Sequence, residues 1–280
     1  MASIRVGHRL SADERADRRD RERQQVEAAV RALLTSEGWQ RWAQTRATFH
    51  RYSWGNCSLI AMQRPDATEV AGFRAWQALG RQVRKGERSI RILAPMSVSE
   101  RDSAGDETGE RVTFFRAVSV FDIAQTDGEP LPERPREPIT GDSHASFLVP
   151  LTEHARALGF TVQRKALEHA GGYCDVKAKR IVLSSDLGSI NAQVRVLVHE
   201  LAHAHGVGYA DYGREDAEVV VETAAVIVCG SLGLDTSGES IPYIAGWGEA
   251  TDLAAIGKHA ETVDAIARKL EIACGLGGEQ

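Results

Sequence analysis

The sequence predicts an α+β fold in two parts that differ in charge and are separated by a proline-rich segment. Residues 1–96 hold 18 Lys+Arg and 10 Asp+Glu, a net charge of +8, and the other 184 residues hold 16 and 29, a net charge of −13. Four of the eight prolines lie between Asp127 and Asp142. Within each part the spacing of apolar residues changes between a helical and an alternating period. We expect one domain over 1–126, a linker over 127–142 and a second domain over 143–280.

The composition is that of a folded, water-soluble protein, with 42% hydrophobic and 26% charged residues among 280. No apolar run approaches the roughly 20 residues that cross a bilayer, and residues 1–23 lack the apolar core of a signal peptide. The four cysteines are widely spaced and form no Cys-x-x-Cys pair. These features predict a cytoplasmic protein with reduced thiols and no membrane partner.

The first part is expected to begin with helices and to continue as a β-hairpin. A charged helical arm starts at Ser11, where Ser-x-x-Glu resembles a capping box. Apolar spacing predicts further helices over 39–50, 53–64 and 73–79, the last ending at Gly80. Strands are predicted over 89–94 and 112–123, with a polar loop over 99–111 between them.

The second part is expected to mix helices with short strands. Helices are predicted over 149–158, 191–205, 215–232 and 252–274, and strands over 160–164 and 173–183. Residues 241–248 are expected to form a loop. The strand over 173–183 could lie at a sheet edge and pair with an extended substrate.

The helix predicted over 191–205 carries the motif His199-Glu200-Leu201-Ala202-His203. Residues four apart share a helix face, so both imidazoles can coordinate Zn²⁺. Glu200 points to the neighbouring edge of that face, where it can act as the general base that activates water for attack on a carbonyl. Burying two histidines and a glutamate in an apolar helix is costly without such a role. The motif therefore predicts a zinc site of the metallopeptidase type.

A catalytic zinc site needs a third protein ligand. The metzincin pattern would place histidine at position 209 and a methionine turn downstream. Here the residue is Tyr209, and every methionine lies upstream of the motif. Tyr209 is expected to be structural, with oxyanion stabilisation as the alternative. His205, two residues beyond His203, is expected to point elsewhere.

The third ligand is instead expected from the next helix, 215–232. Glu218 and Glu222 are four residues apart and share a face. Glu222 is flanked by valine and alanine, so a metal would compensate its burial, and we predict it as the ligand. Glu218 would then orient a ligand histidine. The reverse assignment remains open.

The first part combines positive charge with aromatic residues. Residues 41–91 hold ten Lys+Arg and three Asp+Glu, and four of the five tryptophans precede residue 77. Cationic side chains neutralise phosphates and rings stack on exposed bases, so the pattern favours unpaired nucleic acid. The predicted DNA contacts are Tyr52, Trp54, Arg81, Arg84, Lys85 and Arg88.

Three stretches resemble antirestriction proteins of the ArdC type: Tyr52 to Trp76, Leu79 to Pro95, and Val120 to Thr126. The resemblance implies a single-stranded-DNA-binding N-terminal domain and a zincin-like metallopeptidase C-terminal domain, distantly similar to ImmA/IrrE peptidases. The His-Glu motif and the two glutamates fall where that domain places its metal site. Such proteins are typical of mobile elements, and the implied role is protection of incoming single-stranded DNA against restriction.

The resemblance therefore predicts single-stranded DNA and an unidentified protein or peptide as partners, and Zn²⁺ as cofactor. Two other hypotheses remain. The chain could be a peptidase whose N-terminal domain recruits a protein substrate, or a binding protein in which zinc is only structural.

Overall fold

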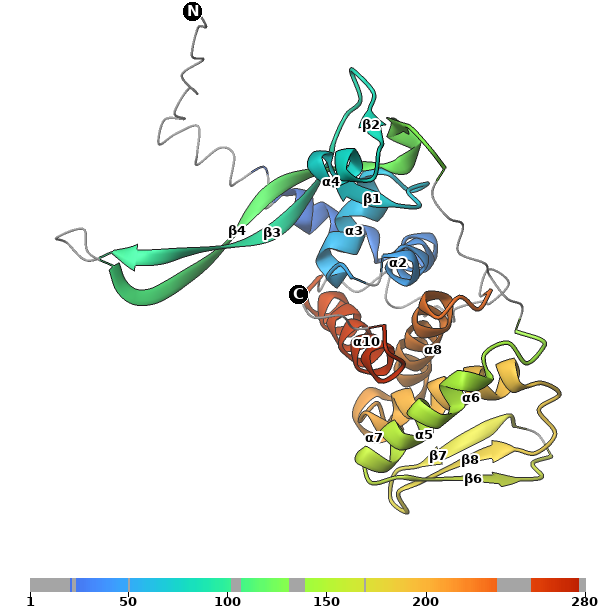
Figure 1. Cartoon of the computed structure of the whole chain (residues 1–280). Helices are drawn as coiled ribbons and strands as arrows, with labels where there is room; N and C mark the ends of the chain where they lie inside the picture. Colours follow the sequence, from blue (N-terminus) through green and yellow to red (C-terminus); the bar gives the residue numbers. More distant parts are fainter. Residues whose placement is uncertain are drawn as a thin grey trace, which may run out of the picture.

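Helices from both parts of the sequence pack together in the middle of the molecule, with one β-sheet on each side (Figure 1). The computed structural model describes residues 21, 24–49, 51–101, 107–130, 139–168, 170–235 and 253–276. The start of the arm predicted at Ser11 (residues 11–20, 22 and 23) and the loop predicted over 241–248 lie outside these residues, and residues 24–32 of the arm are helical. The mixture of helices and strands confirms the predicted α+β class.

Two helices form the base of the N-terminal part. Helix α2 spans Ser36–Thr48 and helix α3 spans Trp54–Gln63. Each begins at a residue whose hydroxyl accepts a backbone N–H of the first turn, Thr35 for α2 and Ser53 for α3. These caps satisfy donors that a helix start leaves unpaired, so the boundaries follow from local sequence.

A three-stranded antiparallel sheet in the order β1-β4-β3 lies above these helices. Its strands are β1 (Val70–Gly72), β3 (Ile90–Arg101) and β4 (Glu107–Asp122). Helix α4 (Phe73–Ala78) follows β1, and a small pair joins β2 (Gln82–Val83) to β5 (Thr126–Asp127) after the short 3₁₀ helix Ile123–Gln125.

Side-chain amides of α3 close the free edge of this sheet. Asn56 donates to the Leu93 carbonyl at 2.8 Å and accepts the Leu93 N–H at 2.9 Å. Gln63 makes the same exchange with Arg91, at 2.8 and 2.9 Å. Two amides therefore replace the pairing partner that an edge strand lacks.

The loop predicted over 99–111 was wrong at both ends. Strand β3 continues to Arg101 and β4 begins at Glu107, with a register irregularity between Ser99 and Arg101. The two strands form a ribbon that extends well beyond the helices (Figure 1). A polar stretch can stay extended there because cross-strand hydrogen bonds satisfy the backbone without an apolar core.

The C-terminal part holds a second sheet against two helices. Strands β6 (Thr161–Lys165), β7 (Gly172–Asp175) and β8 (Arg180–Ser184) are ordered β6-β8-β7, and β7 runs antiparallel at the edge. The single strand predicted over 173–183 is thus two strands. Lys179, with φ of 50°, lies in the turn between them. The remaining elements are the 3₁₀ helix Ala145–Phe147, α5 (Leu148–Ala157), α6 (Ile190–Ala204), α7 (Tyr209–Tyr212), α8 (Arg214–Ser231) and α10 (Leu253–Ala273).

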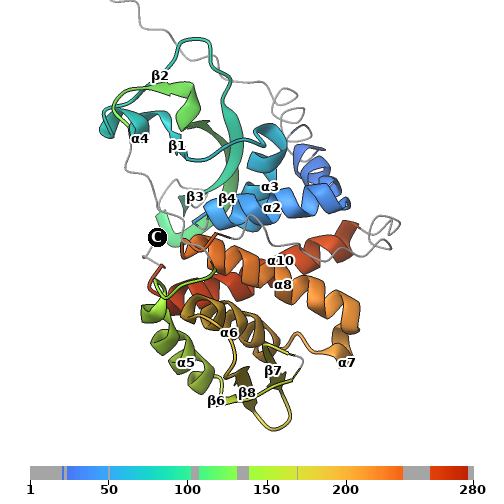
Figure 2. The same ribbon diagram turned by 90° about the vertical axis from the view of Figure 1, so that its right-hand side faces the viewer.

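The two parts share one hydrophobic core. Helix α2 packs on α8, and α8 packs on α10 and α6, so apolar residues from 33 to 270 form a single buried cluster (Figure 2). The Trp39 indole N–H donates to the Thr223 hydroxyl at 2.9 Å across this contact. Helices therefore bring the two parts into direct contact. Of the predicted linker, residues 131–138 lie outside the described part.

Two other predictions from the sequence concern the cysteines and membrane-spanning helices. All four cysteines are free thiols. No helix among the described residues has the length and apolar character needed to cross a bilayer.

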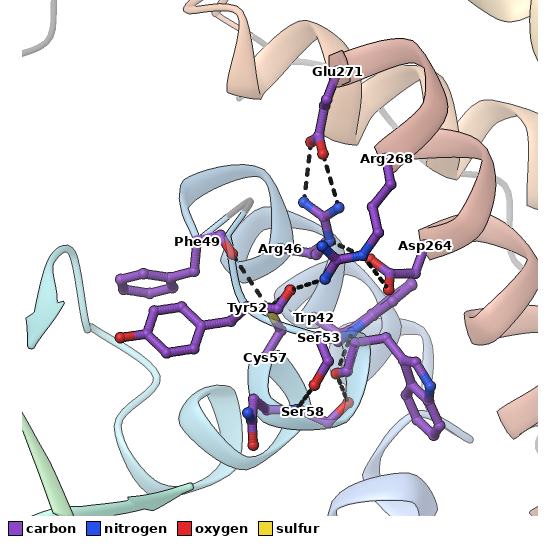
Figure 3. A network of polar contacts seen from close by, with 12 residues as sticks. Trp42, Arg46, Phe49, Tyr52, Ser53, Cys57, Ser58, Asp264, Arg268 and Glu271 are labelled. Carbon is purple, nitrogen blue, oxygen red and sulfur yellow. Dashed lines mark hydrogen bonds and ion pairs between the residues drawn. The ribbon is translucent and has the colours of Figure 1, made fainter. Parts of the chain in front are cut away.

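A buried ion network joins α2 to α10 (Figure 3). Arg46 is completely buried and donates through Nε to Asp264 at 2.5 Å and through both terminal nitrogens to Glu271 at 3.0 and 2.9 Å. Arg268 also donates to Asp264, and to the Tyr52 carbonyl. Burial opposes the charge on Arg46, but the hydrogen bonds and charges of Glu271 and Asp264 raise its pKa, so it stays ionised.

Replacing Arg46 by methionine should destabilise the protein severely. The substitution keeps most of the side-chain volume but leaves two buried carboxylates short of their counter-charge, which costs about 3–5 kcal/mol. Chemical denaturation followed by circular dichroism measures the loss.

The matched control is Arg31→Met. Arg31 pairs with Glu27 at 3.0 Å with both side chains more than half exposed, and such pairs contribute at most about 1 kcal/mol. Equal unfolding free energies for the two variants would contradict the account of the Arg46 network.

Candidate metal centre

The His-Glu motif lies in the last two turns of α6, against the core of the C-terminal part. Helix α6 begins at Ser189, whose hydroxyl accepts the Ala192 N–H, and one side of it is fully buried. His199 and His203 emerge beside that buried side. Their rings lie 5.3 Å apart, almost perpendicular to each other. The predicted spacing of four residues therefore places both imidazoles together.

Helix α8 supplies a carboxylate between the two imidazoles. Glu218 lies 3.7 Å from His199 Nε2 and 3.6 Å from His203 Nε2. Among the described residues, His199, His203 and Glu218 form the one group of three side chains whose donor atoms gather closely enough to hold a metal ion. Tetrahedral bonds of 2.0–2.1 Å give ligand separations of about 3.3 Å. Small rotamer adjustments would bring the three to that spacing.

The other nitrogen of each imidazole is already engaged. His199 Nδ1 lies 3.0 Å from a carboxylate oxygen of Glu222, and His203 Nδ1 lies 2.8 Å from the Val207 carbonyl. These acceptors hold the proton on Nδ1, which leaves the lone pair of Nε2 facing Glu218. The tautomer that binds a metal is thus preset by the protein.

The structure therefore reverses the predicted roles of the two glutamates. Glu222 is turned away from the gathered donor atoms and is occupied by His199 Nδ1 and by an ion pair with Arg195. Burial opposes its charge, yet the His199 hydrogen bond and the Arg195 charge lower the pKa of Glu222. The greater burial of Glu222 reflects these partners, and the side chain placed to be a ligand is Glu218.

Glu218 is held as a carboxylate. The neighbouring His203 imidazole and a hydrogen bond from the Tyr209 hydroxyl lower the pKa of Glu218 to about 2, against the effect of burial. Burial in turn opposes the charged form of His203, but Glu218 raises the pKa of that imidazole. A positive charge at this point is therefore favoured, whether it comes from a proton or from a metal ion.

Glu200 lies at the same pocket, next to the gathered donors. It is 6% exposed, and burial raises its pKa although His199 and His203 act in the opposite direction. Gly172 of β7 makes room for it: a Cβ there would lie 2.7 Å from Val196 and 3.3 Å from Glu200 Cγ. A side chain at 172 would push the edge strand off α6.

The pocket has a volume of about 280 Å³ and lies between β7 and the start of α7. Edge strand β7 forms one wall, and Tyr209, half exposed, forms part of another. Burial and Glu218 raise the pKa of Tyr209 to about 12, so its hydroxyl is a hydrogen-bond donor near neutral pH. The pocket is lined by Gly172, Tyr173, Cys174, Val176, His199, Glu200, His203, Val207, Gly208, Tyr209 and Glu218.

His205 lies apart from this group. Its Nε2 faces Nε2 of His154 on α5 at 2.9 Å, and burial lowers its pKa to about 4.

Sequence reasoning missed Arg195, which neutralises Glu222. Its position one helical turn before His199 is a signal that could have identified it.

The predicted DNA contacts differ sharply in accessibility. The Tyr52 hydroxyl donates to the Val70 carbonyl, and its ring packs edge-on against Phe49. The Trp54 ring is half-buried against the core. Arg81 is 8% exposed and donates to Thr126 and to the Gly128 carbonyl. Folding contacts therefore engage the Tyr52 and Arg81 side chains and cover part of the Trp54 ring, and a role for these three in DNA binding stays a prediction.

The other three predicted contacts are exposed. Arg84 donates to Glu87 and Asp127, so part of its charge is neutralised. Lys85 and Arg88 are exposed on the turn that follows β2. These two remain available to a polyanion.

Helices α6 and α8 bring His199, His203 and Glu218 together, with Glu200 alongside. This arrangement is a candidate site for a divalent metal ion. Residues 17–121 match the family model for the N-terminal domain of the anti-restriction factor ArdC. The N-terminal part of the chain is therefore ArdC-like.

Two solved structures are similar to this chain. The metal-free crystal structure of antirestriction ArdC from plasmid R388 superposes with a TM-score of 0.50 at 19% identity, covering 80% of this chain and 83% of that one. It supports the fold. The Mn(II)-bound structure of that protein gives a TM-score of 0.47 at 17% identity, with 80% and 86% covered.

Two uncharacterized proteins are similar in sequence. Protein y4eC of Sinorhizobium fredii is 28% identical over 64% of this chain and 62% of its own length. Protein pXO2-81 of Bacillus anthracis is 26% identical over 73% of this chain and 42% of its own length. The chain thus spans less than two thirds of either relative.

Removing Glu218 should weaken metal binding more than removing Glu222. Glu218→Ala deletes a ligand, whereas Glu222→Gln keeps an acceptor for His199 Nδ1, and changes to such outer partners cost about 10- to 100-fold in affinity. Competition with a chromophoric chelator measures both. Glu215→Ala, an exposed position on the same helix, should leave affinity unchanged. A greater loss in the Glu222 variant would restore the assignment predicted from sequence.

Proposed function

We propose that the chain binds single-stranded DNA through its N-terminal part and hydrolyses peptide bonds at a zinc site in its C-terminal part, in an antirestriction role. The observation that carries the catalytic half is the convergence of His199, His203 and Glu218, with Glu200 in the same pocket. The DNA half is supported by the ArdC-type domain over 17–121 and by its excess of basic residues.

Zinc is proposed because two imidazoles and one carboxylate, with room for a fourth ligand, are the donors of catalytic zinc sites. Imidazole also suits other first-row metals, so competition among zinc, manganese, cobalt and nickel identifies the preferred ion. The bound metal would supply Lewis-acid polarisation of a carbonyl oxygen and lower the pKa of water.

The residues of the chain would divide the remaining work. Glu200, buried beside the donors, would take a proton from water and return it to the leaving amine. Its raised pKa suits this exchange. The Tyr209 hydroxyl, on the pocket wall, would donate to the oxygen that gains charge. Edge strand β7 would pair with an extended peptide.

Glu200→Gln should separate catalysis from metal binding. Losing a general base lowers the rate by about 10²- to 10⁴-fold, while the ligands remain. We expect zinc-loaded wild type to release fluorescent peptides from labelled casein, tested with and without oligo-dT, and Glu200→Gln to retain zinc without this activity.

Equal rates for wild type and Glu200→Gln would contradict the proposed role of Glu200. A zinc-loaded wild type that cleaves nothing under either condition would favour the binding protein with structural metal.

Single-stranded DNA binding is tested by fluorescence anisotropy with a labelled 20-nucleotide oligo-dT. Phosphate contacts dominate such binding, so affinity should fall steeply as salt rises. Matched duplex should compete poorly. Absence of binding at low salt would refute the DNA half and favour the alternative in which the N-terminal part recruits a protein.

A further inference from the structure

The sheet β1-β4-β3 has two faces with different surroundings. Alternate residues along a strand point to opposite sides. Ile90, Ile92 and Val120 are buried in the shared core, on the side of α2 and α3. Helices α2 and α3 thus cover one face of the sheet, while α4 packs beside β1, where the buried Trp76 donates to the Phe121 carbonyl.

Residues of the opposite face do not belong to that core. The register pairs Ala71 with Phe121, Arg91 with Ser119, and Leu93 with Ala117. None of these six residues is part of the shared apolar cluster or packs against it. We call the side of the sheet that carries these six residues the outward face.

Two phenylalanines stand exposed along the outward face. Phe115 is on the same side of β4 as Phe121 and is 67% exposed. Phe73, just after β1, is 42% exposed, and its ring meets Phe121 edge-on with centroids 6.5 Å apart. Gly72 pairs with Val120, so the two rings are separated by about five strand residues, or roughly 17 Å. That length accommodates several nucleotides of an extended strand.

The segments that carry these rings have a positive net charge, although Arg81 is buried and Arg84 is paired with Glu87 and Asp127. Residues 70–94 and 115–122 contain seven Lys+Arg and two Asp+Glu, a net charge of +5. Both acids are engaged: Asp122 is buried and accepts backbone N–H groups, and Glu87 pairs with Arg84. Arg74 and Arg116 are exposed.

Arg91 adds a charge on the outward face itself. Its guanidinium donates to the Ser119 hydroxyl at 2.8 Å and to the Ala117 carbonyl at 3.3 Å, so it lies flat across β3 and β4. It remains partly exposed there. A cation fixed in this way beside exposed rings is placed for a phosphate between stacked bases.

We propose that the outward face of the β1-β4-β3 sheet is where single-stranded DNA lies, with Phe73 and Phe115 stacking on bases and Arg91 and Arg74 contacting phosphates. The inference rests on the proposed DNA binding and assigns it a surface. Unpaired strands are the occupant because rings need free base faces, which a duplex does not offer. This surface replaces Tyr52, Trp54 and Arg81, whose side chains serve the fold.

The test measures oligo-dT affinity of the full chain by anisotropy. Stacking is worth about 5- to 100-fold per ring, so Phe73→Ala and Phe115→Ala should each weaken binding by such a factor. Arg74→Gln should lower the salt slope by about 0.7. The matched control is Ile272→Ala, an apolar residue on α10 that is 62% exposed, close to the 67% of Phe115, and it should bind like wild type. Unchanged thermal unfolding shows that the variants are folded.

The possible results separate the surface from the function. Wild-type binding with no loss in either phenylalanine variant overturns this surface and leaves DNA binding intact. Equal losses for single-stranded and duplex DNA overturn base stacking. A wild type that binds no oligonucleotide refutes the DNA half of the proposed function and this inference with it.

Discussion

The buried guanidinium of Arg46 holds the N-terminal helices on the C-terminal helices, and the relative position of the two parts depends on it. Its partners Asp264 and Glu271 come from a helix more than 200 residues away in the chain. Removing any member leaves a buried charge uncompensated, which is strongly destabilising. Trp39 and Thr223 add a neutral hydrogen bond beside it. Because Thr223 adjoins Glu222 on α8, the helix that supplies the metal donors also contacts the N-terminal part.

The candidate metal centre shows how outer hydrogen bonds prepare inner donors. Glu222 and the Val207 carbonyl hold the Nδ1 protons, which directs both Nε2 atoms toward Glu218. Arg195 balances the charge of Glu222, so the two glutamates do not both depend on one cation. The outer atoms of these side chains thus have partners within the protein. The two Nε2 atoms and the Glu218 carboxylate converge on one point, where a cation would bind.

Local sequence signals predicted the elements and half of the site. Apolar spacing predicted α2, α3, α6 and α8, and the spacing of four brought His199 and His203 together. The choice between Glu218 and Glu222 could not be made from burial, because Arg195 and His199 explain the burial of Glu222 equally well. The sequence likewise predicted Arg81 as a DNA contact, because its partner Thr126 lies 45 residues away in the chain and becomes a neighbour only on folding. Such contacts depend on tertiary structure.

The most direct test of the central claim is a crystal structure of the zinc-loaded protein with anomalous data at the zinc edge. The account predicts a single anomalous peak within about 2.0–2.2 Å of His199 Nε2, His203 Nε2 and a Glu218 oxygen, with Glu222 still bonded to His199 Nδ1. A peak coordinated by Glu222 or by the Cys174 sulfur, or no peak between α6 and α8, would contradict it.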